Sequence, residues 1–406
     1  MTATGEDGVP AVELRGEGPP TGTAEDVDRI RRTLEGILGV PATTGNQIEV
    51  LRNGDEIFPA MLEAIRGAER FVDFLTFVSW TGPVADEFAE ALAERAAAGL
   101  RVRVLLDAVG ARSMNRELIE LMESSGAEVE WFRVPVTWRV WEVEHRTHRK
   151  LLIVDELVGF TGGVGIAAEW MGDARGPDEW RDTHFRVRGP AVDGLRGAFT
   201  TNWIETGRAI FDDDTFIDQP RIGSHCAQVV RGAAEIGWSD VAVLLRTMVR
   251  LARHRLRITT AYFTPDDEFT ALLLDAVERG VEVEIIVPGP HADKRVVQVA
   301  GEAQYDELVH AGVRIWHFQP SMMHAKILTI DGLAACVGSA NINSRSMARD
   351  DEVCVVVFEP ELVATLDAHF EEDRDRSVRI EPQRWARRSA PQRLYERATA
   401  LIKPRL

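Results

Sequence analysis

The chain has 406 residues, of which 45% are hydrophobic and 28% are charged, and its formal net charge is −18. This length allows about two to three domain-sized cores, and the negative charge argues against a broad basic surface that holds nucleic acid. The three cysteines, Cys226, Cys336 and Cys354, lack CxxC spacing. They predict neither a disulfide framework nor a zinc site and are typical of a reducing compartment.

The N-terminal 24 residues are rich in Gly, Pro, Thr and acids, which predicts a disordered tail. They lack the basic and apolar regions of a signal peptide, and no uncharged apolar run approaches the roughly 18 residues of a membrane span. We therefore expect a cytoplasmic protein without a transmembrane segment. Thr23 as N-cap, or the acidic turn that follows it, begins a helix that ends near Gly39, within a helical lead-in over 25–45.

From about Asn46 strands and helices alternate, which predicts an α/β fold with a mixed, largely parallel sheet flanked by helices. The strand 70–79, a helix and the strand 100–107 are matched by the strand 255–265, a helix and the strand 281–288. A third strand follows in each half, ending at Phe132 and at Phe318. The repeat predicts two pseudo-symmetric domains, 46–215 and 216–406, with the active site at their interface.

Each half then carries the pattern His-x-Lys-x4-Asp: His148, Lys150 and Asp155 in the first, and His324, Lys326 and Asp331 in the second. Residues two apart in a strand share a face, so each His projects with its Lys. Each Asp is out of phase and falls at a hairpin turn.

If the chain reverses directly after each Asp, Gly163 lies opposite His148 and Ser339 lies opposite His324. The segments "GGVG" and "GSAN" then let an anion approach the backbone closely.

The doubled pattern resembles the phospholipase D superfamily, and segments such as "YFTPD", "EWRDTH" and "VGSANINSRSM" resemble the bacterial cardiolipin synthases. The resemblance implies that His148 attacks phosphorus to form a covalent phosphohistidine and that His324 acts as general acid and base. It implies no metal and no cofactor. One histidine alone would be a satisfied core residue. Asp155 and Asp331 are counted with the catalytic set of the pattern, and they are expected mainly to shape the turns, with a direct chemical role as the alternative.

Further residues are expected to bind phosphate or to orient the histidines. Asp182 and Glu352 would each hold the Nδ1–H of the histidine in its own half, while Gly163, Ser339 and Asn341 would contact the phosphate. The family usually has Asn where this chain has Gly165, so one side-chain donor is missing from the first half.

The expected activity is phosphatidyl transfer between phosphatidylglycerol-type phospholipids, giving cardiolipin and glycerol. Hydrolysis to phosphatidic acid, a nuclease activity and a non-catalytic lipid-binding module are the alternatives. The expected partners are a phospholipid substrate and a membrane surface, without nucleic acid. Candidate lipid contacts, which packing explains as well, are Trp138, Trp141, Met322, Met323 and a basic C-terminal helix within 384–406.

Overall fold

The computed structural model describes residues 22–77, 80–112, 114–134, 145–208, 217–233 and 239–385. Most of the predicted tail, Trp138, Trp141 and nearly all of the basic C-terminal segment lie outside these ranges. Helix α1 (Ala24–Leu38) begins and ends as its sequence predicts: Thr23 caps it in a capping box with Asp26, and Gly39 ends it with φ of 66°. The lead-in is shorter than expected, because β1 already begins at Thr43.

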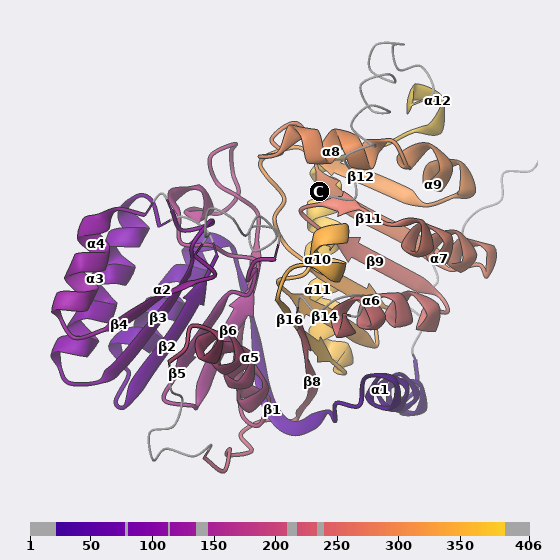
Figure 1. Ribbon diagram of the computed structural model, residues 1–406. Coiled ribbons are helices and arrows are strands. Elements are labelled where there is room, and N and C mark those ends of the chain that lie inside the picture. The colour runs from indigo at the N-terminus through magenta and orange to yellow at the C-terminus, as the bar shows by residue number, and fades with distance from the viewer. Residues whose placement is uncertain are drawn as a thin grey trace, which may run out of the picture.

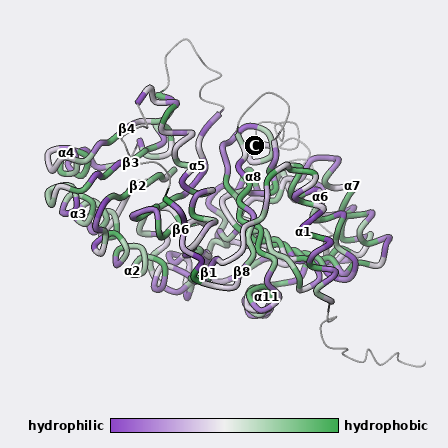
Figure 2. The backbone as a smooth tube through the Cα atoms, turned by 90° about the horizontal axis from the view of Figure 1, so that it is seen from below, coloured by the Kyte–Doolittle hydropathy of each residue, from purple (hydrophilic) through white to green (hydrophobic). Residues whose placement is uncertain are grey.

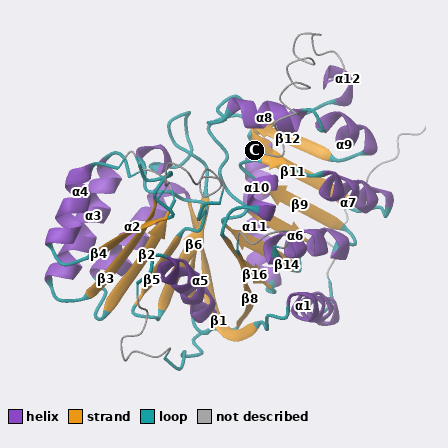
Figure 3. Ribbon diagram, viewed as in Figure 1, coloured by secondary structure: helices purple, strands orange, loops and turns teal. Residues whose placement is uncertain are grey.

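The first lobe is a seven-stranded sheet with helices on both faces (Figures 1 and 3). Its helices are α2 (Asn53–Arg66), α3 (Pro83–Ala97), α4 (Arg116–Ser124) and α5 (Ala191–Glu205). The strands, in their spatial order, are β1 (Thr43–Arg52), β7 (Thr183–Arg188), β6 (Val158–Gly162), β5 (Leu151–Val154), β2 (Phe71–Thr76), β3 (Arg101–Asp107) and β4 (Glu128–Phe132). The short helix η2 (Ala168–Trp170) lies between β6 and β7.

The second lobe repeats this order and adds one strand at its far edge. Its helices are α6 (Asp240–Leu251), α7 (Asp267–Glu278), α8 (Arg295–Glu302), α9 (Tyr305–Ala311), α10 (Ser344–Ala348), α11 (Pro360–Asp375) and α12 (Pro382–Trp385). Its strands, in spatial order, are β8 (His225–Gly232), β16 (Glu352–Val357), β14 (Ala334–Gly338), β13 (Ile327–Ile330), β9 (Arg255–Thr259), β11 (Glu282–Pro288), β12 (Arg314–Phe318) and β17 (Ser377–Arg379). A separate pair is formed by β10 (Phe263–Thr264) and β15 (Ile342–Asn343).

The two lobes join edge to edge into one 15-stranded sheet, because β1 pairs with β8. In Figure 2 these two strands lie side by side between the lobes. The predicted repeat is therefore confirmed as two lobes with equivalent strand orders. Within this 15-stranded sheet, the described strands pair in parallel only in the groups β2, β3 and β4 and β9, β11 and β12, a smaller share than expected. The short β5–β6 and β13–β14 hairpins are antiparallel. The pairs that join these hairpins to their neighbours in the sheet are antiparallel as well.

A shared hydrophobic core fixes the lobes relative to each other. One face of each sheet packs under its own helices, α2 and α3 in the first lobe and α6 and α7 in the second. On the other face, α5 and α11 belong to a single cluster, in which Val187 and Leu195 of the first lobe join Val355 and Leu366 of the second. Such burial makes the interface between the lobes a rigid part of the fold. Among the described helices, none is both long and apolar enough to cross a membrane.

The two hairpins differ from the expected register by one residue. β5 and β6 pair Val154 with Val158, and β13 and β14 pair Ile330 with Ala334, so each turn has three residues. Asp155 and Asp331 begin these turns with φ of 54° and 55°, a conformation that Asp tolerates better than most residues. The predicted turn positions are confirmed. The pairing of Gly163 with His148 and of Ser339 with His324 is wrong.

Candidate active site

His148 and His324 lie three residues before β5 and β13, where the backbone contacts the opposite lobe. The backbone N–H of His148 donates to the carbonyl of Asp351 at 2.9 Å, and that of His324 donates to the carbonyl of Arg181 at 2.7 Å. Both acceptors belong to the other lobe. These backbone bonds explain why the histidines do not pair within their own hairpins, and they bring both histidines to the interface.

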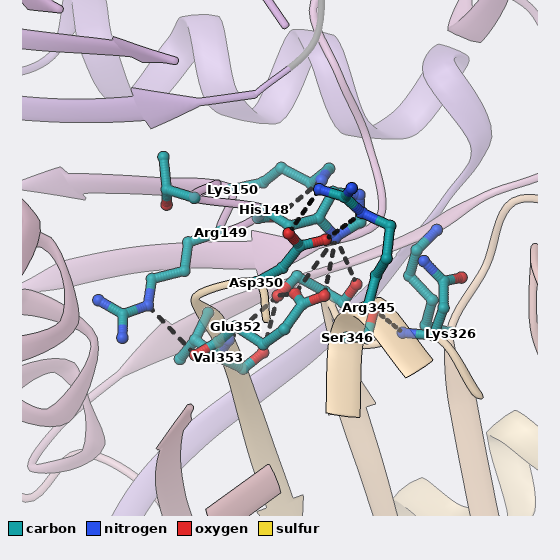
Figure 4. Close-up of polar contacts among 12 residues, drawn as sticks. His148, Arg149, Lys150, Lys326, Arg345, Ser346, Asp350, Glu352 and Val353 are labelled. Carbon is teal, nitrogen blue, oxygen red and sulfur yellow. Dashed lines mark hydrogen bonds and ion pairs between the residues drawn. The ribbon is translucent and has the colours of Figure 1, made fainter. Parts of the chain in front are cut away.

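Each histidine contacts a buried carboxylate of the other lobe. His148 Nδ1 lies 3.0 Å from Glu352 Oε1 (Figure 4), and His324 Nδ1 lies 2.8 Å from Asp182 Oδ2. The expectation that each carboxylate holds the histidine of its own half is therefore wrong. The physical reason is this backbone contact, since Asp182 and Glu352 directly follow Arg181 and Asp351, the residues whose carbonyls bind the two histidines.

The charges of these four groups follow from their burial and pairing. Burial opposes ionisation of Glu352, but His148 and Lys150 outweigh it and lower the pKa of that carboxyl to about 2. The pKa of Asp182 is also lowered, because its hydrogen bond to His324 overcomes the effect of burial. Burial and Lys150 lower the pKa of His148, and burial and Lys326 lower that of His324 to about 4. In the unliganded protein at pH 7, both imidazoles are neutral and both carboxylates ionised.

The two lysines supply positive charge beside the histidines. Lys150 Nζ donates to the carbonyl of His148 at 2.7 Å. Lys326 Nζ donates to the carbonyl of His324 and lies beside that residue's ring, 3.0 Å from Nδ1 and 3.3 Å from Nε2. Burial lowers the pKa of Lys150 to about 7, assisted by the charge of Lys326, and it lowers that of Lys326 to about 8. A bound anion would favour the charged form of both ammonium groups.

Two residues of the "GSAN" segment also reach this site. The Ser339 hydroxyl donates to Glu352 Oε2, and the Ser339 carbonyl lies 3.1 Å from His148 Nδ1. Asn341 is 2% exposed, and its side-chain oxygen has no hydrogen-bond partner among the described residues. Buried side-chain polar atoms usually have a hydrogen-bond partner. Ser339 therefore fixes the carboxylate, while Asn341 keeps hydrogen-bonding capacity for another group.

The structure does not bring Asp155 and Asp331 to the histidines. They lie beyond the far ends of the four-residue strands β5 and β13. The Asp155 carboxylate accepts hydrogen bonds from the backbone N–H groups of three consecutive residues, 69–71. Asp331 does the same for residues 253–255. These contacts anchor the entry into β2 and β9.

The surroundings of the two histidines differ, which the sequence analysis did not anticipate. Trp170, Trp180 and Tyr262 surround His324, with ring centroids 5.1, 5.4 and 6.4 Å from the imidazole. Two of them occur in the quoted segments "EWRDTH" and "YFTPD". Beside His148 lie, among the described residues, one ring, that of Phe77 at 5.2 Å between centroids, and an ion pair in which Arg345 Nη2 is 2.8 Å from Asp350 Oδ1 (Figure 4).

The two methionines next to His324 do not form a lipid contact surface. Met322 and Met323 are 1% and 0% exposed. Their place in the interior follows from the backbone contacts of this segment, because the Met322 carbonyl accepts from the Arg181 N–H at 2.9 Å.

The comparisons with known proteins agree with the two-lobed site. The sequence model of the family described as "Cardiolipin synthase, PLD-like domain" matches residues 61–170 and 245–374, one stretch in each lobe. Cardiolipin synthase 2 of Bacillus anthracis is 30% identical over 365 residues, which cover 89% of this chain and 71% of that protein. Cardiolipin synthase A of Pseudomonas aeruginosa (strain LESB58) is 31% identical over 379 residues, covering 92% of this chain and 76% of that protein.

Among solved structures, phosphatidylserine synthase from Haemophilus influenzae Rd KW20 matches with a TM-score of 0.69 at 15% identity. The match covers 94% of this chain and 100% of that chain, and at this identity it bears on the fold alone. The family match and the relatives extend over both lobes and both histidines. The chain therefore belongs to the cardiolipin synthases with a phospholipase D-like domain and is an enzyme of the phospholipase D superfamily.

Proposed function

We propose that this protein transfers a phosphatidyl group from one phosphatidylglycerol-type lipid to another through a phosphohistidine on His148. The observation that carries the proposal is the pair of buried imidazoles, each held at Nδ1 by a carboxylate of the other lobe. With Nδ1 occupied, Nε2 of each ring is the atom available for chemistry. The names of the relatives, which are cardiolipin synthases, indicate the class of substrate.

In the first step, neutral His148 attacks phosphorus through Nε2. The bond from phosphorus to the glycerol oxygen breaks, and His324 gives its Nε2 proton to that oxygen. His324 must be protonated to do this, although burial and Lys326 lower its pKa to about 4 in the unliganded protein. A phosphodiester anion bound beside the ring raises that pKa, so the acid proton is taken up together with the substrate.

In the second step, the hydroxyl of an incoming phosphatidylglycerol gives its proton to the now neutral His324 and attacks phosphorus. The bond between phosphorus and nitrogen breaks, which releases cardiolipin and regenerates neutral His148. Lys150 and Lys326 balance the negative charge that accumulates on the phosphoryl oxygens, and the side-chain amide of Asn341 orients a polar group of the substrate. The residues of the chain thus account for every bond and proton in both steps.

Two features of this proposal concern the setting of the site. We place the protein at the membrane surface, because its substrates would reside there, and in the cytoplasm. Gly165 occupies the position equivalent to Asn341, counted from Gly163 and Ser339. Among the described residues, the amide side chain of Asn341 thus has no counterpart at Gly165, and this side of the site offers backbone groups and aromatic rings.

The test is an incubation with vesicles of phosphatidylglycerol, followed by separation of the lipid products. We expect cardiolipin and glycerol in equal amounts from the wild type. His148→Ala should form neither product and no phosphoenzyme. His324→Ala should lose turnover while His148 remains able to accumulate an acid-labile phosphoenzyme. Phosphatidic acid as the only product would instead indicate hydrolysis, and near wild-type turnover of either variant would refute the paired mechanism.

A further inference from the structure

The carboxylates that contact the two histidines are held in different ways. The strand registers make the two sites comparable, since Gly162 pairs with His184 in the first lobe and Gly338 pairs with Cys354 in the second. Asp182 and Glu352 each lie two residues before the strand residue that pairs with the glycine. Gly163 and Ser339 each directly follow that glycine. Gly163 is therefore the counterpart of Ser339, and Asp182 is the counterpart of Glu352.

In the second lobe, Ser339 fixes the carboxylate. Its hydroxyl donates to Glu352 Oε2 and accepts from the backbone N–H of Val353 at 3.0 Å. His148 Nδ1 lies 3.0 Å from Oε1 and 3.2 Å from Oε2 of the same carboxylate. A hydroxyl thus holds in place the carboxylate that orients the imidazole.

In the first lobe, Gly163 has no side chain to do this, and there is no room for one. A Cβ atom at Gly163 would lie 2.3 Å from Asp182 Oδ1 and 2.6 Å from Oδ2. Asp182, which is one methylene shorter than Glu352, occupies the space that a serine side chain would need. The first lobe therefore differs from the second at both positions together, with Gly163 and Asp182 in place of a serine and a glutamate. As a result, the carboxylate of Asp182 receives no hydrogen bond from a serine hydroxyl at this position.

Trp170 supplies a donor at this place. Its indole Nε1 lies 2.9 Å from Asp182 Oδ2, the same oxygen that lies 2.8 Å from His324 Nδ1. The backbone N–H of Thr183 donates to the other oxygen at 2.8 Å. Trp170 is 2% exposed. Its segment is an insertion, because Gly163 and Asp182 are 19 residues apart whereas Ser339 and Glu352 are 13 apart.

From this arrangement we propose that Trp170 is a positioning residue for His324 and replaces, from an inserted segment, the hydroxyl that Ser339 provides in the other lobe. The proposal rests on the function proposed above. By donating to Asp182 Oδ2, the indole holds the carboxylate where it can accept the Nδ1–H of His324. It also makes that carboxylate less basic, so that the proton stays on Nδ1 and Nε2 faces the leaving oxygen.

The test uses Trp170→Phe, which removes the N–H and keeps an aromatic ring, with Trp180→Phe as the matched control. The Trp180 ring packs on both Trp170 and His324, at 4.3 and 5.4 Å between centroids, but it donates no hydrogen bond to Asp182 among the described contacts. Two donors are compared in single-turnover experiments: phosphatidylglycerol, whose leaving glycerol needs a proton, and phosphatidyl-p-nitrophenol, whose leaving group does not.

We expect Trp170→Phe to slow the first turnover with phosphatidylglycerol about tenfold to hundredfold, the factor expected for one lost hydrogen bond to a charged acceptor. Release of nitrophenolate by Trp170→Phe should change less than about threefold. Trp180→Phe, which alters a ring beside His324 but no hydrogen bond to Asp182 among the described contacts, should change both reactions by similar factors. Ser339→Ala, which loosens the carboxylate of the nucleophile His148, should slow both donors. An unchanged first turnover of Trp170→Phe with phosphatidylglycerol, or an equal loss with both donors, would overturn the role of Trp170. A wild type inactive on both donors would instead overturn the proposed function.

Discussion

The crossed pairing of histidines and carboxylates can be measured as a coupling free energy. The perturbations are His148→Gln, Glu352→Gln and Asp182→Asn, together with the two double variants that contain His148→Gln. In a double-mutant cycle, two residues in contact show non-additive changes in the free energy of unfolding, whereas residues without a shared contact are additive within about 0.5 kcal/mol.

The expected coupling follows from the charge state of Glu352. The pKa of this carboxyl falls from an ordinary 4.5 to about 2, and at about 1.4 kcal/mol per pKa unit the ionised form gains about 3 kcal/mol in the folded protein. His148, Lys150 and Ser339 share this stabilisation. A hydrogen bond to a charged acceptor contributes about 1.5–3 kcal/mol, so the share of His148 is about 1–2 kcal/mol.

The assay is denaturant unfolding at pH 7 of the wild type, the three single variants and the two double variants. We expect a coupling of about 1–2 kcal/mol between His148 and Glu352 and less than about 0.5 kcal/mol between His148 and Asp182. The opposite ranking would mean that each carboxylate serves its own lobe and would refute the crossed arrangement. Variants that retain the m-value of the wild type are comparable, since a changed m-value indicates a different unfolded or native state.

Two further predictions concern stability. Asp331→Ala should lower the free energy of unfolding by more than about 3 kcal/mol, because the backbone N–H groups of residues 253–255 lose a charged acceptor. Asp331→Asn should lower this free energy by less. Both variants should keep most of the turnover per folded molecule. Loss of turnover in Asp331→Asn without loss of stability would show a catalytic role. Burial lowers the pKa of His184 from 6.5 to about 4. Above pH 6.5 this residue is neutral in the folded and the unfolded protein, and its protonation in the unfolded protein lowers the free energy of unfolding as the pH falls from 6.5 to 4. This amounts to about 3 kcal/mol, and unfolding of His184→Gln should depend less steeply on pH in this window; an identical slope would contradict the neutral buried state.

Features that depend on neighbouring residues in the sequence could be predicted well. The cap at Thr23 and the stop at Gly39 are backbone effects of single residues, and both are present. The turns at Asp155 and Asp331 are likewise local. The predicted strand registers were one residue off because the sequence pattern does not distinguish a two-residue turn from a three-residue turn. The distinction lies in the backbone conformation, which here includes positive φ at Glu156.

The site required information that a linear pattern lacks. Asp182 and Glu352 were identified as orienting groups, but their partners depend on how two separate lobes meet. Trp170 was not identified from the sequence, because it lies 12 residues from Asp182 and the contact between them depends on the fold. Only the missing side chain at Gly163 hinted that another donor was needed, and the crowding that explains it is a property of the folded chain.

The crossing also explains why neither half of the repeat would suffice alone. The first lobe contains His148 and Lys150 but lacks Glu352, and the second contains His324 and Lys326 but lacks Asp182. Separated, Glu352 would lose the partners that outweigh the cost of its burial, and an unpaired buried carboxylate becomes protonated or is driven into water. The pairing of β1 with β8 and the cluster shared by α5 and α11 therefore do more than stabilise the fold. They set the positions of the hydrogen bonds that orient both imidazoles, so a substitution in this shared core is expected to disturb both histidines together.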